Sequence, residues 1–158
     1  MALQGPDDIR LRRVLDDGPQ PPCLADGFSL RTLQHGDEAA IHELLRDVFS
    51  NEEPSFEAWW ARLSSDAEFD PALCFLAFDS AGRLVAVAQC WTSAFVKDLA
   101  VAPSARRQGL AEALMWHVFA AFKERGERHV DLKTSTVENA DAVRLYRRLG
   151  MVEVDWAG

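Results

Sequence analysis

The residues with the clearest potential for chemistry lie in the stretch Arg106-Arg107-Gln108-Gly109-Leu110-Ala111, where a strand-like run gives way to a long apolar stripe. The first turn of a helix leaves backbone N–H groups without intrahelical partners, at the positive end of the helix dipole. Arg106 and Arg107 add positive charge, and Gly109 lets the backbone approach a phosphate closely. The small side chain of Ala111 leaves the first turn accessible. This stretch therefore predicts an anion site.

The known nucleotide-binding fingerprints are absent from this stretch. It contains neither G-x-G-x-x-G nor G-x-x-x-x-G-K-[ST], so a dinucleotide fold and a P-loop are disfavoured, and a different pyrophosphate ligand is expected. The alternative interpretation is a solvated basic loop before an ordinary helix. Arg-x-x-Gly alone does not distinguish the two, and the surrounding elements must decide.

Hydrophobic periodicity predicts those elements along the whole chain. Asp37 and Ser55 are expected to cap the first two helices, residues 79–82 to form a hairpin turn, and Gly126 and Gly150 to end the last two helices. A Pro-rich linker, 18–27, follows the first strand. The expected strands are 9–16, a run from Phe28, 72–79, 83–91, 94–101, 129–134 and 151–157, and the expected helices start at Asp37 and Phe56 and span 110–126 and 139–149.

This order predicts an α/β fold of the α+β type, with a mixed sheet and helices over both faces. A chain of 158 residues is sufficient for one domain with its own core. Within it, we expect residues 1–26 to form an N-terminal strand and linker and residues 27–158 to form the main domain.

Composition excludes several classes of function. A net charge of -8 argues against non-specific nucleic-acid binding, and the absence of an apolar run of about 18 residues argues against a membrane span, so a cytoplasmic protein is expected. Cys23, Cys74 and Cys90 show no spacing typical of a disulfide framework or a zinc site. The four histidines show no ligand spacing, and no metal is expected.

The second half of the chain gives the basic stretch its context. Val101-Ala102-Pro103 precedes it, and the segment from Asn139 to Met151, with Leu145-Tyr146 and Gly150-Met151, follows after one strand. Together these motifs resemble the Gcn5-related N-acetyltransferase (GNAT) family, over residues 27–155 and most specifically over 84–151. The resemblance implies acetyl-CoA as cosubstrate and a mostly antiparallel sheet that splays between the two strands flanking the CoA-binding helix.

The resemblance also implies roles for individual residues. Residues 106–111 would cradle the pyrophosphate, and the main chain at Leu99 and Val101 would bind the pantetheine arm. Asn139 would contact the pantetheine, with helix capping as the alternative. Tyr146, the only tyrosine, would donate a proton to the CoA thiolate as general acid.

The acceptor side of the predicted site is less specific. Asp98 interrupts an apolar run beside the expected thioester and is the first candidate for the base, although a solvent-facing strand Asp is an equal alternative. Glu52 and Glu53 are candidates for attracting a cationic amine. Three tryptophans are candidate walls of the acceptor pocket, with burial in the core as the alternative: Trp59, Trp60 and Trp91.

The chain departs from the family pattern at its ends. Family members usually have two closing strands after the Gly-Phe element, whereas only about eight residues follow Gly150 here. We expect the strand at 9–16 to take the place of the missing strand at the sheet edge, and a partner subunit in a homodimer is the alternative donor. The predicted function is direct acetyl transfer to a primary amine of a small molecule or peptide, and the alternative is a non-catalytic CoA-binding domain.

Overall fold

The strands form one mixed sheet with the order β2-β3-β4-β5-β6-β1-β7. The structure is a computed structural model, and it describes residues 7–16, 24–50 and 52–156. The predicted mixed sheet with flanking helices is confirmed. The strands are β1 (Asp8–Val14), β2 (Ser29–Thr32), β3 (Phe69–Phe78), β4 (Leu84–Trp91), β5 (Phe95–Val101), β6 (His129–Ser135) and β7 (Val152–Val154), and the helices are α1 (Glu38–Val48), α2 (Phe56–Ser64), α3 (Leu110–Glu124), α4 (Ala140–Arg148) and the short 3-10 turn η1 (Pro103–Ala105).

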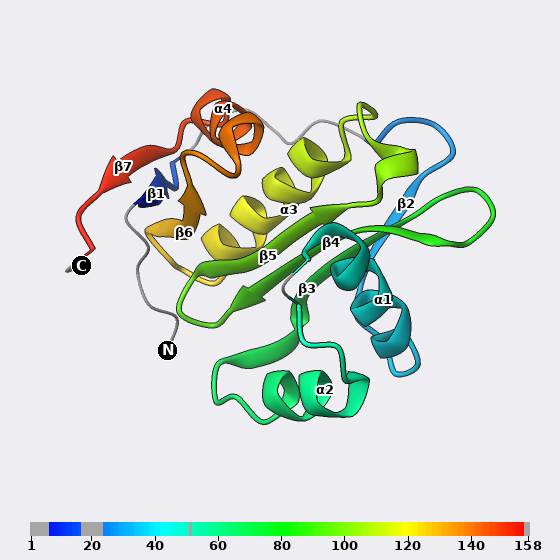
Figure 1. Ribbon diagram of the computed structural model, residues 1–158. Helices are drawn as coiled ribbons and strands as arrows, with labels where there is room; N and C mark the ends of the chain where they lie inside the picture. Colours follow the sequence, from blue (N-terminus) through cyan, green and yellow to red (C-terminus); the bar gives the residue numbers. More distant parts are fainter. Residues whose placement is uncertain (1–6, 17–23, 51, 157–158) are drawn as a thin grey trace.

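Helices cover both faces of the sheet and divide the core in two (Figure 1). Side chains alternate along each strand, so Leu76 and Val87 pack under α1 and α2, whereas Phe75 and Ala88 pack under α3 and α4. Helix α3 supplies the largest buried contribution, including Phe122 at 0% exposure. This central helix fixes the position of the basic stretch at its N-terminal end.

Strand β1 lies inside the sheet and not at its edge, which corrects the predicted position. It pairs antiparallel with β6 over residues 8–14 and with β7 over residues 10–12, so β7 is the edge strand. The observed strand ends at Val14 and so is shorter at its C-terminal end than the predicted 9–16, although Leu15 still donates its N–H to the Arg128 carbonyl in the loop before β6. The first predicted segment is thus an integral part of the same sheet.

A buried ion cluster ties β1 to β6. Asp131 is 1% exposed and accepts hydrogen bonds from Arg10 at 2.8 Å and Arg12 at 2.7 Å. Burial opposes the charged form of the carboxyl, but the hydrogen bonds from the two guanidinium groups outweigh it and lower the pKa of Asp131. The arginines on β1 therefore compensate a charge that β6 buries.

Several predicted boundaries differ from the structure for local reasons. Asp37 sits at the N-cap position of α1, but its carboxylate bonds to Arg31 and to the Gln34 N–H and does not cap the helix. Ser55 does cap α2, through the Ala58 N–H at 3.2 Å. Strand β3 begins before Pro71, with a register shift between Phe69 and Cys74 that accommodates the proline.

The last strand is shorter than predicted, since β7 covers residues 152–154 of the expected 151–157. Ala157 lies outside the described residues, as do Cys23 and most of the predicted linker.

The inserted β1 gives a stability prediction. Leu11 is 0% exposed, whereas Val14 on the same strand is 61% exposed. We expect Leu11→Ala to lower the free energy of unfolding by about 2–5 kcal/mol, because it leaves a cavity in the core. Val14→Ala, the matched control, should change it by less than about 0.5 kcal/mol. Equal urea midpoints for the two variants would show that β1 does not pack as described.

Candidate active site

The candidate site begins where β5 separates from β6. The two strands run parallel and pair only at Phe95 with Asp131 and at Val96 with Leu132. A register shift between β4 and β5 falls at the same place, because Cys90 pairs with Val96 whereas its neighbour Gln89 pairs with Asp98. The extra residue bends β5 away from β6, and Figure 1 shows α3 between the diverging strands. The predicted splay of the sheet is confirmed.

Gln89 supports this bend from the neighbouring strand. Its side chain is 2% exposed, and its amide Nε2 donates to the Cys90 carbonyl at 3.0 Å, at the residue where the register shifts. Its Oε1 is buried without a hydrogen-bond partner among the residues that the structure describes. Sequence analysis did not single out Gln89, since a glutamine in a strand gives no signal of such a role.

A cavity of about 160 Å³ occupies the opening between the diverging strands. Tyr146 and Asp98 both line it, so the structure brings the two predicted catalytic residues together. Leu99 and Asn139 line it as well. Phe49, at the end of α1, closes its opposite side, although the sequence had suggested tryptophans for that role.

Tyr146 reaches the cavity from α4 with little exposure to solvent. Its side chain is 7% exposed, and burial raises the pKa of the phenol to about 12. The described part of the chain offers its hydroxyl no hydrogen-bond partner, so the hydroxyl keeps both its proton and its donor capacity at neutral pH.

Asp98 stands on β5, on the face of the sheet that α1 and α2 partly cover. Its carboxylate forms an ion pair with Lys97 at 2.8 Å, and its side chain is 15% exposed. For Asp98 to act as a base, its ion pair with Lys97 must therefore break so that the carboxylate can accept the proton of the acceptor amine. Lys97 and Lys133 also line the cavity, and sequence analysis singled out neither.

A larger cavity of about 530 Å³ continues along β5 toward the basic stretch. It shares Leu99 and Asn139 with the first cavity and adds Val101 and Arg106. From Lys97 onward, no described strand pairs with the β6 side of β5, so this edge offers main-chain N–H and C=O groups to a ligand. Asn139 precedes α4 without a side-chain capping bond, which leaves its amide available to the cavity.

A third cavity, of about 350 Å³, lies at the N-terminus of α3. It shares Val101 and Arg106 with the second cavity, so the three cavities adjoin one another along β5, and together they are called the furrow below. Arg107 and Gly109 have positive φ angles of 64° and 74° on either side of Gln108, the left-handed backbone conformation that is found in anion-binding turns. Five of the six residues 106–111 line the cavity; the exposed side chain of Gln108 does not.

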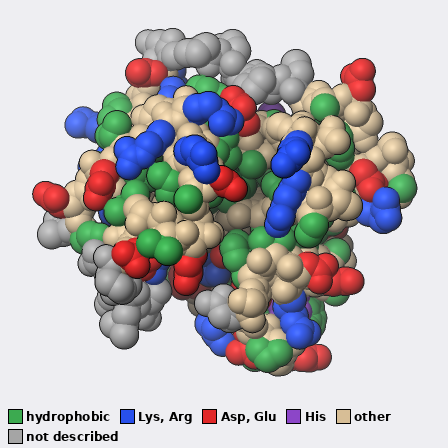
Figure 2. Space-filling model, turned by 45° about the horizontal axis from the view of Figure 1, so that its top comes forward, with side chains coloured by type: hydrophobic (Ala, Val, Ile, Leu, Met, Phe, Trp, Pro, Cys, Tyr) green, Lys and Arg blue, Asp and Glu red, His purple; other side chains and the backbone are tan. Residues whose placement is uncertain are grey.

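Basic side chains gather around this end of the furrow, and Figure 2 shows groups of them on this face of the molecule. Arg148, on α4, lines the third cavity opposite the loop and lies 3.9 Å from Glu112. Sequence analysis missed Arg148. It lies two residues after Tyr146 on the same short helix, and this position could have suggested that Arg148 lies near the site.

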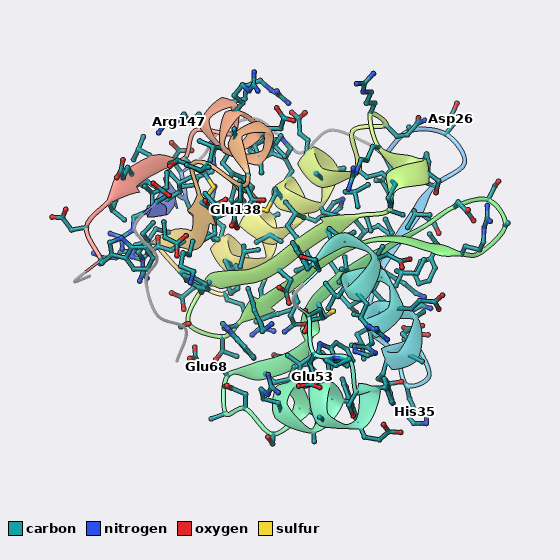
Figure 3. The ribbon with its side chains drawn as sticks, in the orientation of Figure 1. Asp26, His35, Glu53, Glu68, Glu138 and Arg147 are labelled. Carbon is teal, nitrogen blue, oxygen red and sulfur yellow. The ribbon has the colours of Figure 1, made fainter. Side chains whose placement is uncertain are left out.

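The other predicted acceptor residues lie elsewhere. Glu53 lies between α1 and α2 (Figure 3), where Arg62 and the Ser55 N–H bind its carboxylate, while its carbonyl lies 2.6 Å from Nε2 of His42. Trp59 is buried between the two helices, and Trp60 stacks edge-on against Phe69. Neither Glu52 nor any of the candidate tryptophans lines the described furrow.

Neither of the two described cysteines lines the furrow. Cys74 and Cys90 are free and buried, and desolvation raises the pKa of both thiols, which keeps them protonated. Among the described residues there is no group of three potential metal ligands and no helix long and apolar enough to span a membrane.

Comparisons with known proteins agree with this geometry. The family model described as "Acetyltransferase (GNAT) family" matches residues 38–151. The chain belongs to the GNAT family. A GCN5-related N-acetyltransferase from Sphaerobacter thermophilus superposes with a TM-score of 0.80 at 30% identity, over 93% of this chain and 48% of that one.

Curated relatives of this GNAT chain are named acetyltransferases. It is 33% identical to mycothiol acetyltransferase of Actinosynnema mirum, over 89% of this chain and 50% of the relative, and 32% identical to streptothricin acetyltransferase of Streptomyces lavendulae, over 79% and 63%. The chain thus spans about half the length of the mycothiol acetyltransferase.

The buried phenol of this GNAT domain gives a spectroscopic prediction. Because Tyr146 is the only tyrosine, phenolate absorbance reports on it alone, and we expect a midpoint of about 12, in contrast to about 10 in denaturant. The unfolded state loses this proton first, so stability should fall by up to about 1.4 kcal/mol per pH unit between these two values. A native midpoint near that of the denatured chain would place the phenol in solvent, contrary to the structure.

Proposed function

We propose that this domain transfers the acetyl group of acetyl-CoA directly to a primary amine of a small molecule or peptide. The observation that carries the proposal is the row of three adjoining cavities, which extends from the basic turn at Arg106 to the cavity lined by Tyr146 and Asp98. The names of the curated relatives support the same reaction class.

We propose that coenzyme A lies along the furrow from end to end. The backbone amides between Arg107 and Gly109, with Arg106 and Arg148 nearby, suit a pyrophosphate. The unpaired edge of β5 at Leu99 suits the amides of a pantetheine arm, which would bind it as an additional strand. The thioester would then lie in the cavity at the point of divergence. Bound acetyl-CoA supplies an activated acyl group and a thiolate leaving group.

Side chains that line that cavity would accept a proton and donate a hydrogen bond in the reaction. The acceptor nitrogen, as a neutral amine, attacks the thioester carbonyl carbon, the C–S bond breaks with release of the CoA thiolate, and the proton that the nitrogen loses passes to a base. We propose Asp98, directly or through water, for that role. Its place in the cavity beside Tyr146 supports this proposal.

Tyr146 would stabilise the leaving sulfur. Burial makes its phenol, with a pKa of about 12, a weaker acid than an ordinary thiol, whose pKa is about 8.5. A completed proton transfer from the phenol to the thiolate is therefore unfavourable, and a hydrogen bond to the developing negative charge is the contribution we propose. This refines the general-acid role that the sequence suggested.

The central experiment measures release of free CoA with a panel of amines. We expect Tyr146→Phe to lower kcat by about 10²-fold while the affinity for acetyl-CoA stays unchanged, because only the hydroxyl is removed. Acetyl-CoA binding without turnover on any amine would favour a non-catalytic CoA-binding domain. Full activity of the Phe variant would remove Tyr146 from the mechanism.

The anion-binding turn can be tested with two glycines on one helix. Gly109 precedes α3 and Gly126 follows it; both have positive φ angles, and a Cβ on either would meet no atom within 4 Å. Alanine at each position should therefore lower stability by a similar amount, about 1 kcal/mol. We expect only Gly109→Ala to weaken binding of CoA, by about tenfold, because its methyl group would occupy the ligand's space. Equal CoA affinities in calorimetry would place the pyrophosphate elsewhere.

A further inference from the structure

Lysine side chains mark the acceptor end of the furrow. From their placement, and resting on the proposed acetyl transfer, we propose that the acceptor carries a carboxylate or similar anionic group a few bonds from its amine. Lys97 and Lys133 would hold that group at the mouth of the reaction cavity.

The two lysines occupy equivalent positions on the diverging strands. Val96 and Leu132 are the last paired residues of β5 and β6, and the next residue on each strand is a lysine that lines the cavity. The chain contains three lysines in all, and the third, Lys123, lies on α3. Two of the three thus line the cavity that also contains Tyr146 and Asp98.

Existing carboxylates do not fully balance the positive charge at this place. Lys97 pairs with Asp98 at 2.8 Å, and Lys133 pairs with Asp8 at 3.7 Å. Arg10 lies directly opposite Lys133 in the β1–β6 register, and like charges in that arrangement repel. Among the described residues, the cluster that also includes Arg12 and Asp131 contains four basic side chains and three acidic ones. This local excess occurs in a chain whose net charge is -8.

A polycationic acceptor fits the same cavity poorly. Asp98 is the acidic residue among the described side chains that line it, and Lys97 already occupies that carboxylate. Glu53, the earlier candidate for attracting a cation, is held by Arg62 outside the furrow. An acceptor with a carboxylate would instead bind the lysines, and in doing so it would free Asp98 from Lys97 to take the amine's proton.

Three acceptors of equal chain length test the proposal: γ-aminobutyrate, butylamine and putrescine. Their reacting amines are alike, and they differ in a far end that is negative, neutral or positive. We expect kcat/KM to fall in that order by about tenfold from the first to the second, and further for putrescine, because the far end meets two lysines at the cavity mouth. Highest kcat/KM for putrescine would overturn the proposal, while acetyl transfer itself would stand.

Lysine variants locate the effect. Lys133→Glu should reverse the preference between γ-aminobutyrate and putrescine, and Lys133→Gln should weaken it, because Lys97 remains. Lys123→Glu makes the same change of charge on α3, away from the furrow, and should leave the wild-type order intact. The same preference in the Lys133→Glu and Lys123→Glu variants would show that Lys133 does not contact the acceptor.

Binding measurements separate this proposal from the reaction. If none of the three amines releases CoA, the proposed function fails for these acceptors, and calorimetry with the protein–CoA complex still tests the anion site. Tighter binding of γ-aminobutyrate than of butylamine, with a smaller difference in Lys133→Gln, would support the site. Equal binding of the two would refute it.

Discussion

The candidate site depends on one local constraint, the register shift that places an extra residue in β5 at Lys97. A parallel pair that continued along β5 and β6 would satisfy the backbone groups of both strands and close the sheet. Pairing instead stops after Val96 and Leu132, and the remaining half of β5 keeps a free edge. Gln89 contributes to the irregular geometry by donating to the Cys90 carbonyl next to the shift. The cavity and the unpaired edge of β5 both begin where this pairing stops, and Lys97 and Lys133 are the first residues beyond it.

The elements around the site could be predicted because their signals are local. The apolar stripe of α3 and the glycine at each end predicted where that helix begins and ends. The basic loop before it predicted the anion-binding turn. The splay between β5 and β6 could be predicted only through the family resemblance. The shift at Lys97 depends on pairing between strands, and a single strand's pattern does not encode its register.

The residues around the acceptor were predicted least well, for a similar reason. From the sequence, Glu53 was a candidate for attracting a cationic amine. Its carboxylate instead binds Arg62, which lies nine positions later in α2, and the sequence gives no signal of this pairing. Trp59 was a candidate for a pocket wall although burial in a core is the commoner fate of an aromatic residue, and in the structure it packs in the core between α1 and α2. Phe49 and Lys133 come from segments far apart in the chain and meet only when α1 lies against the open end of the sheet.

The position of β1 bears on how the chain folds. Its partners Asp131 and Val152 lie more than 115 residues away in sequence, as the hydrogen bond between Arg12 and Asp131 illustrates with a separation of 119. Contacts between residues so far apart in the sequence slow folding, because a long loop must close before they can form. During synthesis, β1 is made before β6 and β7, and it must remain unpaired until both have emerged. The half of the sheet that contains β5 can assemble earlier. We therefore expect the completion of the β6-β1-β7 half to be the late, rate-limiting step of folding. Until that step, the exposed edges of these strands can associate with other chains.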